Sequence, residues 1–255
     1  MEAGYFAIFW LLIGRPLNAV IDRLLPHDYV DGVIAKGAHT RPLQWWEWLP
    51  ILSAVGAAKT RRVPFPNLWV RYPIVELTTA ALFGLTWYRL SQLNLQIWLI
   101  LISLAFIATL ITLAFIDFET TYLPDALVLP LLTVAIVVSF LVPDREWWQG
   151  LAGARLDMRG FYPFAWIGDR LNRPVMGWGD VKLAAALGAI LGLAPLGLGL
   201  YIGVIIGGAV AIVVYAARLI GFNRILIPYG PYLVASGIIS MLYFRSIPDW
   251  ISGQL

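Results

Sequence analysis

Long apolar runs set the limits on what this chain can fold into. Residues 95–116 and residues 199–217 contain no charged side chain. A helix needs about 20 mostly apolar residues to cross a bilayer, whereas the strands of a transmembrane barrel alternate apolar and polar residues. Because these runs are continuously apolar, they predict transmembrane helices. With 60% hydrophobic and 13% charged residues, the composition is that of an integral membrane protein.

The predicted fold is an all-α, polytopic helical bundle with about eight crossings, or seven crossings and one re-entrant segment. Expected spans are residues 4–25, 72–88, 95–116, 126–142, 181–198, 199–217 and 229–244. The remaining crossing would fall within residues 147–171, where only 161–167 are continuously apolar. Its polar character comes from Arg155, Asp157, Arg159, Asp169 and Arg170.

Three parts are expected along the chain. Residues 1–25 form a first, uncleaved transmembrane helix, because they lack the basic start and small-residue cleavage site of a signal peptide. Residues 26–71 form a cytoplasmic loop subdomain, since basic residues outnumber acidic ones there. Residues 72–255 form a transmembrane core.

The composition also excludes several classes of site. A net charge of +3 is too small to indicate nucleic-acid binding. The chain contains no cysteine and only two histidines. It therefore offers no thiolate nucleophile, no cysteine-ligated zinc and no histidine-rich metal site.

Two aspartates stand at the ends of apolar runs. Asp117 follows residues 95–116, and Asp180 follows a Gly177-Trp178-Gly179 turn at the start of residues 181–198. The glycines would let an extended substrate strand approach the backbone beside Asp180. Two carboxylates at close range share a proton, because ionising both is costly. The ionised member can then take a proton from water while the other polarises a peptide carbonyl, which predicts peptide hydrolysis.

Each aspartate also has a simpler interpretation. Asp117 could be an interfacial charge, and Asp180 could cap the helix that follows it. Asp125 is placed to be the N-cap of the span that begins at Ala126. Glu119 is expected to point into water. These alternatives stay open on residue pattern alone.

Two further charged residues, Glu76 and Lys182, each have two interpretations. Glu76 lies one turn inside a predicted span, where a carboxylate needs a partner such as Arg15 or Arg23. It is interpreted as structural or substrate-contacting. Lys182 lies two residues after Asp180 and could meet lipid headgroups or take part in the chemistry.

The same motifs resemble a known family. Residues 177–183 resemble the GxGD-x-K signature of type IV prepilin peptidases, and Asp117 with Leu123-Pro124-Asp125 resembles the second aspartate motif of that family. Further matches lie, in order, at residues 18–26, 49–53, 71–77 and 227–231. A single GxGD would be weak evidence, whereas ordered matches along the chain are specific.

The resemblance implies a membrane aspartic endopeptidase that removes the short basic leader of prepilins and pseudopilins. The cut would fall at the cytoplasmic face of the bacterial inner membrane, where the substrate and lipid are the partners. Asp117 and Asp180 would be the catalytic pair, and Asp125 matches a motif position. Proteolysis would need no cofactor. Many members also methylate the new N-terminus with S-adenosylmethionine, which the sequence leaves open.

The chain departs from the family pattern in its first loop. Members commonly carry two cysteine pairs there, thought to hold zinc, and this chain has none, so zinc is not expected. Two other classes of function remain. One is a transporter or proton relay lined by Glu76, Asp117 and Asp180, although the two aspartates lie at helix ends rather than deep within helices. The other is a catalytically silent scaffold of the pilus or secretion machinery.

Overall fold

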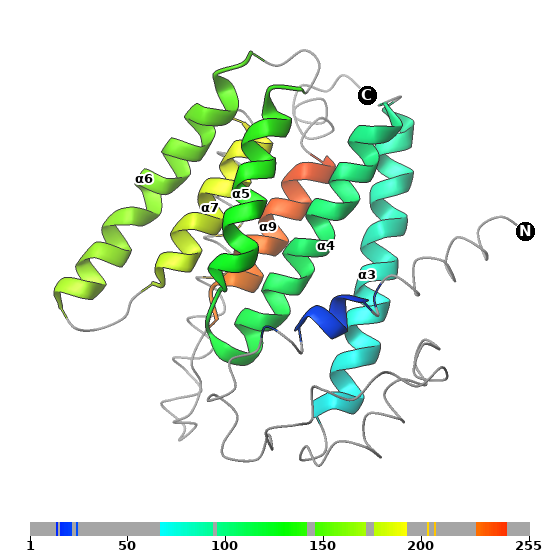
Figure 1. Cartoon of the computed structure of the whole chain (residues 1–255), viewed down its shortest axis with the longest axis horizontal. Helices are drawn as coiled ribbons and strands as arrows, with labels where there is room; N and C mark the ends of the chain where they lie inside the picture. The colour runs from blue at the N-terminus through cyan, green and yellow to red at the C-terminus, as the bar shows by residue number, and fades with distance from the viewer. Residues whose placement is uncertain are drawn as a thin grey trace, which may run out of the picture. The chain divides into compact units, whose positions relative to one another are not determined.

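A computed structural model describes the chain at residues 14, 16–21, 24, 67–93, 96–141, 146–171, 176–192, 203, 207 and 228–243 (Figure 1). Within these residues all regular structure is helical, which confirms the all-α prediction for this part of the chain. The helices are α3 (Asn67–Gln92), α4 (Ile97–Thr120), α5 (Asp125–Ser139), α6 (Gln149–Arg170), α7 (Trp178–Leu191) and α9 (Gly230–Tyr243).

Among the described helices, α4 alone is long and apolar enough to cross a membrane, with 24 residues. Helices α5 and α9 are apolar but shorter, with 15 and 14 residues. The expected number of about eight crossings therefore stays a prediction. Most of the predicted first span, the loop at residues 26–66 and nearly all of residues 193–227 lie outside the described residues.

The chain divides into two compact units, residues 1–116 and residues 117–255. In the first unit, α3 buries Glu76 completely, with no exposed surface. A methyl group at Gly14 would lie 2.6 Å from the Cα of Glu76, so the two backbones approach closely. The burial expected for Glu76 is confirmed, whereas its suggested partners Arg15 and Arg23 lie outside the described residues.

In the second unit, α7 packs against α6 most extensively, then against α5 and α9 (Figure 1). Almost every residue from Asp180 to Leu191 is buried. A helix that is apolar on all sides is stable only when neighbours surround it, which explains why α7 occupies the centre of these contacts. The two ends of α7 are therefore held by packing on several sides.

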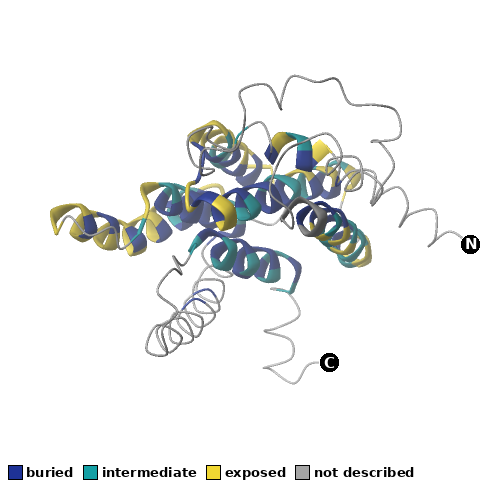
Figure 2. Ribbon diagram, turned by 90° about the horizontal axis from the view of Figure 1, so that it is seen from below, coloured by how far each residue is buried: buried dark blue, intermediate teal, exposed yellow. Residues whose placement is uncertain are grey.

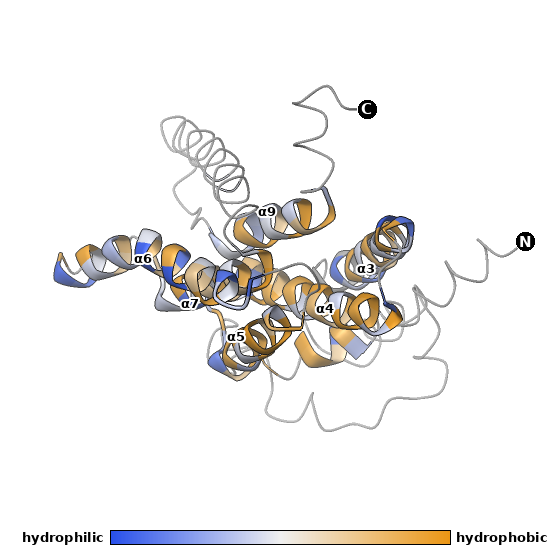
Figure 3. Ribbon diagram, turned by 90° about the horizontal axis from the view of Figure 1, so that it is seen from above, coloured by the Kyte–Doolittle hydropathy of each residue, from blue (hydrophilic) through white to orange (hydrophobic). Residues whose placement is uncertain are grey.

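Helix α6 accounts for the charged stretch that did not fit a simple crossing. It is continuous over 22 residues, and Pro163 lies inside it. Its buried residues recur mostly every three or four positions, as on one face of a helix. They are Gly150, Gly153, Ala154, Asp157, Phe161, Ala165 and Gly168. The remaining face is largely exposed and carries most of the polar residues (Figures 2 and 3).

Glycines bring α6 and α7 into backbone contact. A methyl group at Gly153 would lie 2.2 Å from the carbonyl oxygen of Gly188. One at Gly188 would lie 2.5 Å from the carbonyl oxygen of Gly153 and 2.7 Å from Oδ2 of Asp157. Glycines at such positions let two helices pack backbone to backbone. Gly192 also lies at this contact, with its carbonyl carbon 3.3 Å from a methyl group at Gly153, and it is the C-cap of α7, with a φ of 75°.

Candidate active site

Asp117 lies in the last turn of α4, not after the end of the helix as the sequence predicts. Its side chain is 4% exposed. The backbone N–H of Gly230 donates a hydrogen bond of 2.8 Å to its Oδ2. Gly230 is the first residue of α9, where backbone N–H groups have no partner within the helix. The start of α9 therefore holds one oxygen of Asp117.

A tight turn follows Asp117 and brings the chain to Leu123, which packs against Gly179, the residue before Asp180. Thr121 has a φ of 52°, and its N–H donates to the carbonyl oxygen of Asp117 at 2.7 Å. The turn places Leu123 against Gly179, where a methyl group on the glycine would lie 2.7 Å from the leucine Cβ. Gly179 therefore accommodates Leu123 of this chain. A methyl group at Gly177 would lie 3.4 Å from Oδ2 of Asp180. The approach of a substrate strand to the backbone of Gly177 and Gly179 remains a prediction.

Asp180 lies in the first turn of α7 and uses its two oxygens differently. Its Oδ2 accepts a hydrogen bond of 3.2 Å from the N–H of Gly177, the N-cap residue. An acidic side chain at this position stabilises a helix start by reaching back to the N-cap N–H. The capping interpretation is thus confirmed for one oxygen. The other, Oδ1, is buried and has no hydrogen-bond partner among the described residues.

The two aspartates lie within range of each other's charge. Asp180 precedes the apolar run that begins at Val181. Burial, with a further contribution from the charge of Asp117, raises the pKa of Asp180 to about 7, although the hydrogen bond from Gly177 acts in the opposite direction. A carboxyl group with this pKa is about half protonated at neutral pH. Near neutral pH, Asp180 is therefore available both as an acid and as a base.

Asp125 and Lys182 form an ion pair between α5 and α7. The Nζ of Lys182 lies 2.7 Å and 2.8 Å from the two carboxylate oxygens of Asp125. The prediction that Asp125 is an N-cap is wrong: Pro124 is the N-cap, and Asp125 is the first residue of α5. The carboxylate still lies at the favourable end of the α5 dipole. The ion pair explains the position of Lys182 without the two roles suggested from the sequence, which were contact with lipid headgroups and a part in the chemistry.

The structure collects most of the residues predicted from the sequence. Within residues 117–255, Asp117 and Asp180 interact through their charges. Gly230 contacts Asp117, Gly177 contacts Asp180, and Leu123 packs against Gly179. Glu119 is exposed, as expected. Glu76 belongs to the other compact unit. The contribution of Gly230 was missed, although a glycine at the entry to the last apolar run was its signal.

The donor set for a zinc ion of the expected kind does not exist in this chain, which contains no cysteine. No group of three or more histidine, aspartate or glutamate side chains is arranged for a metal ion within the described ranges. His27 and His39 lie outside them. The expectation that zinc is not bound stays a prediction.

Comparison with known proteins identifies the family of this chain. The sequence pattern of the type IV leader peptidase family matches residues 104–215. A prepilin leader peptidase/N-methyltransferase of Neisseria gonorrhoeae is 32% identical over 223 residues, covering 83% of this chain and 72% of the relative. The chain belongs to the type IV leader peptidase family.

Other relatives extend the match over nearly the whole chain. A prepilin leader peptidase/N-methyltransferase of Pseudomonas putida is 28% identical over 276 residues, covering 95% of this chain and 92% of the relative. A prepilin leader peptidase/N-methyltransferase of Legionella pneumophila is 33% identical over 218 residues, covering 82% of this chain and 71% of the relative. No solved structure matches the chain. As a member of the type IV leader peptidase family, the protein is a membrane-associated peptidase, and both aspartates fall within the matched residues.

Proposed function

We propose that this protein is an aspartic endopeptidase that cleaves type IV prepilins or pseudopilins, with Asp117 and Asp180 as its catalytic pair. The observation that carries the proposal is the electrostatic interaction between two buried carboxyl groups, each at the end of a helix. The names of the relatives support the substrate class.

The different partners of the two aspartates support a different role for each. Asp180 holds the shared proton on Oδ1, the oxygen that has no partner among the described residues. It donates that proton to the carbonyl oxygen of the scissile peptide. Asp117, held by Gly230, takes a proton from the attacking water. A C–O bond forms to the carbonyl carbon and gives a tetrahedral diol. As its C–N bond breaks, the amine leaves with the proton from Asp117, and one hydroxyl of the diol returns its proton to Asp180, which re-forms the C=O bond and regenerates both carboxyl groups.

The short basic leader of the substrate requires acidic groups near the pair. Glu119 is exposed two residues after Asp117, so it can meet a leader by charge complementarity. Asp125 is the second acidic group proposed for this role, and it is paired with Lys182. Leader binding at Glu119 predicts that Glu119→Gln raises KM more than it lowers kcat.

The site would face the cytoplasm at the bacterial inner membrane. Support comes from residues 26–71, whose excess of Lys and Arg favours the cytoplasmic side. The apolar run of α4 leads from the opposite side to Asp117. In this arrangement the domain organisation is a first transmembrane helix at residues 1–25, a cytoplasmic loop at 26–71 and a transmembrane core at 72–255.

N-methylation of the new N-terminus, with S-adenosylmethionine as the methyl donor, is a second activity that the names of the relatives support. The groove on α6 lined by Arg155 and Arg159 does not fit this donor. It has no acidic side chain for the ribose hydroxyls, and its two arginines would repel the sulfonium cation. No step of methyl transfer is assigned to these residues.

The test is cleavage of a prepilin with a Gly-Phe junction by the full-length purified protein in lipid nanodiscs. Asp117→Asn and Asp180→Asn should each reduce cleavage by roughly a thousandfold without lowering the melting temperature. Glu146→Gln, an exposed acidic residue of another segment, is the matched control. Chelator should have no effect, and product mass with added S-adenosylmethionine reports methylation.

Failure has a defined meaning in this assay. If folded wild-type protein cleaves none of several prepilins, the peptidase proposal is overturned in favour of a silent scaffold or a carboxylate relay. If either Asn variant cleaves as well as wild type, the assigned pair is wrong.

A further inference from the structure

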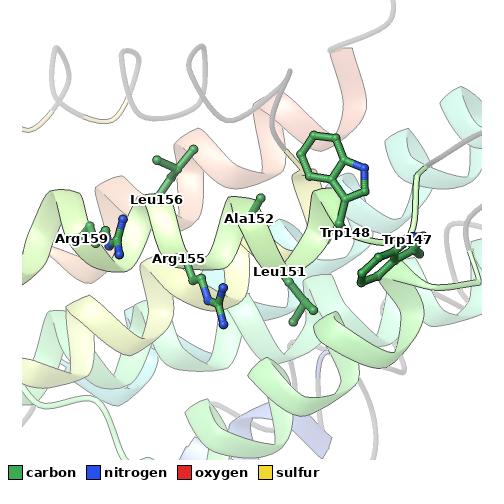
Figure 4. A pocket seen from close by; sticks show the side chains of 7 residues that line it. All are labelled: Trp147, Trp148, Leu151, Ala152, Arg155, Leu156 and Arg159. Carbon is green, nitrogen blue, oxygen red and sulfur yellow. The ribbon is translucent and has the colours of Figure 1, made fainter.

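The exposed side of α6 contains a groove at its N-terminal end. It has a volume of about 460 Å³ and is lined by Trp147, Trp148, Leu151, Ala152, Arg155, Leu156 and Arg159 (Figure 4). We propose that this groove binds an anionic phospholipid, with the headgroup phosphate on the two arginines and an acyl chain along the apolar residues. This binding site is separate from the proposed peptidase function.

The charge of the groove calls for an anion. Arg155 and Arg159 are four residues apart, so they occupy the same face of α6. Both side chains are exposed. In the described part of the chain, neither guanidinium forms an ion pair with a carboxylate, and no acidic residue lines the groove. A guanidinium binds phosphate through two parallel hydrogen bonds, and two of them on one face form a compact phosphate site.

The apolar part of the groove excludes a simple anion as the ligand. Trp147 is 65% exposed, Trp148 is 44% exposed and Leu156 is 49% exposed. A free phosphate would leave these side chains without an apolar partner from the same ligand. Hydrocarbon alone would cover them but would leave two guanidinium groups without an anion, which is costly inside a bilayer. An amphiphile with an anionic head and an apolar tail satisfies both parts.

The geometry of α6 places the charges near a membrane interface. Side chains on a helix lean toward its N-terminus, so both arginines lean toward the tryptophan end. Arg155 lies seven residues after Trp148, about 10 Å along the axis. Its long apolar stem covers part of that distance and brings the guanidinium closer to the interface. Tryptophan is enriched at the level of lipid headgroups, so this is where a phosphate would be met.

The groove lies away from the catalytic pair. The Nε1 of Trp178, two residues before Asp180, donates to Oδ2 of Asp169 at 2.8 Å, near the C-terminal end of α6. Gly153, at the level of the groove, contacts Gly188 in the second half of α7. The two helices are therefore antiparallel, and the groove lies beside the end of α7 opposite to Asp180.

The test measures lipid binding and needs no cleavage, so its failure is distinct from failure of the peptidase proposal. Full-length protein in detergent is titrated with phosphatidylglycerol or phosphatidylcholine, and bound lipid is counted by native mass spectrometry. The variants are the double substitution Arg155→Gln/Arg159→Gln and the matched control Arg170→Gln. Arg170 lies over the ring of Trp166 on the same helix, outside the groove.

Phosphatidylglycerol should bind wild type and Arg170→Gln equally and the double variant roughly 30-fold more weakly. Phosphatidylcholine should bind weakly to all three proteins. The double variant Arg155→Lys/Arg159→Lys should keep most of the binding, which separates loss of charge from misfolding. Equal binding of the two lipids, equal binding by the Gln variant, or displacement by inorganic phosphate at matched concentration would each overturn the proposal.

Discussion

The N–H of Gly230 donates a hydrogen bond to Oδ2 of Asp117 across 113 residues of sequence. Asp180 has an equivalent donor in the N–H of Gly177. Each aspartate therefore accepts a hydrogen bond from a backbone amide at the start of a helix, α9 in one case and α7 in the other. Backbone donors are fixed by the helices that carry them, so both carboxyl groups are oriented before any substrate arrives.

A methyl group at Gly230 should disturb Asp117. It would lie 2.7 Å from Oδ2 and 3.0 Å from the Cβ of Asp117, so the carboxyl group would have to move. We expect Gly230→Ala to reduce kcat/KM by roughly tenfold to a hundredfold. Gly160→Ala is the matched control, because nothing lies within 4 Å of a methyl group there. Equal kcat/KM values for the two variants would contradict the role assigned to Gly230.

Cleavage should fall as pH rises through neutrality. The pKa of Asp180 is raised to about 7, so its carboxyl group keeps the proton below that pH and loses it above. Since the ionised form has no proton to donate, kcat/KM should decrease about tenfold per pH unit on the alkaline side. The measurement is kcat/KM from pH 5.5 to pH 8.5. A value that stays constant to pH 8.5 would show that Asp180 does not act as the acid.

The contact between α6 and α7 should be intolerant of added volume. Methyl groups at Gly153 or Gly188 would lie 2.2 Å and 2.5 Å from backbone oxygens, so the helices would have to separate. Overpacking of this kind costs about 1–3 kcal/mol. Gly153→Ala and Gly188→Ala should both lower the melting temperature in detergent. Gly160→Ala, in the same helix but in open space, should leave it unchanged or raise it.

The ion pair of Asp125 and Lys182 should contribute little to stability. The side chains are 34% exposed for Lys182 and 53% exposed for Asp125, and exposed pairs contribute about 0.2–1 kcal/mol. A double-mutant cycle with Asp125→Ala and Lys182→Ala should give a coupling energy in this range. High salt should reduce it. A coupling of several kcal/mol would mean that the pair is less hydrated than its exposure indicates.

The sequence predicted α4, α5 and α9 because an apolar run is itself the signal of such a helix. It also placed Asp117 and Asp180 correctly at helix ends. It did not predict the contact with Gly230, since the glycine at the entry to the last apolar run does not indicate which side chain its backbone N–H would meet. The N-cap of α5 was assigned one residue late, because Pro124, with a φ of −70°, already stands at the boundary. The glycine contact across α6 was hidden by the charges on its other face.

Asp117 is also the first residue of the second compact unit. Its partner Gly230, and Asp180 with its own partner Gly177, all follow it in the chain. Both carboxyl groups therefore take these backbone donors from residues 117–255. We expect members of the family to vary in length mainly before α4, where an insertion or deletion leaves both donors in place.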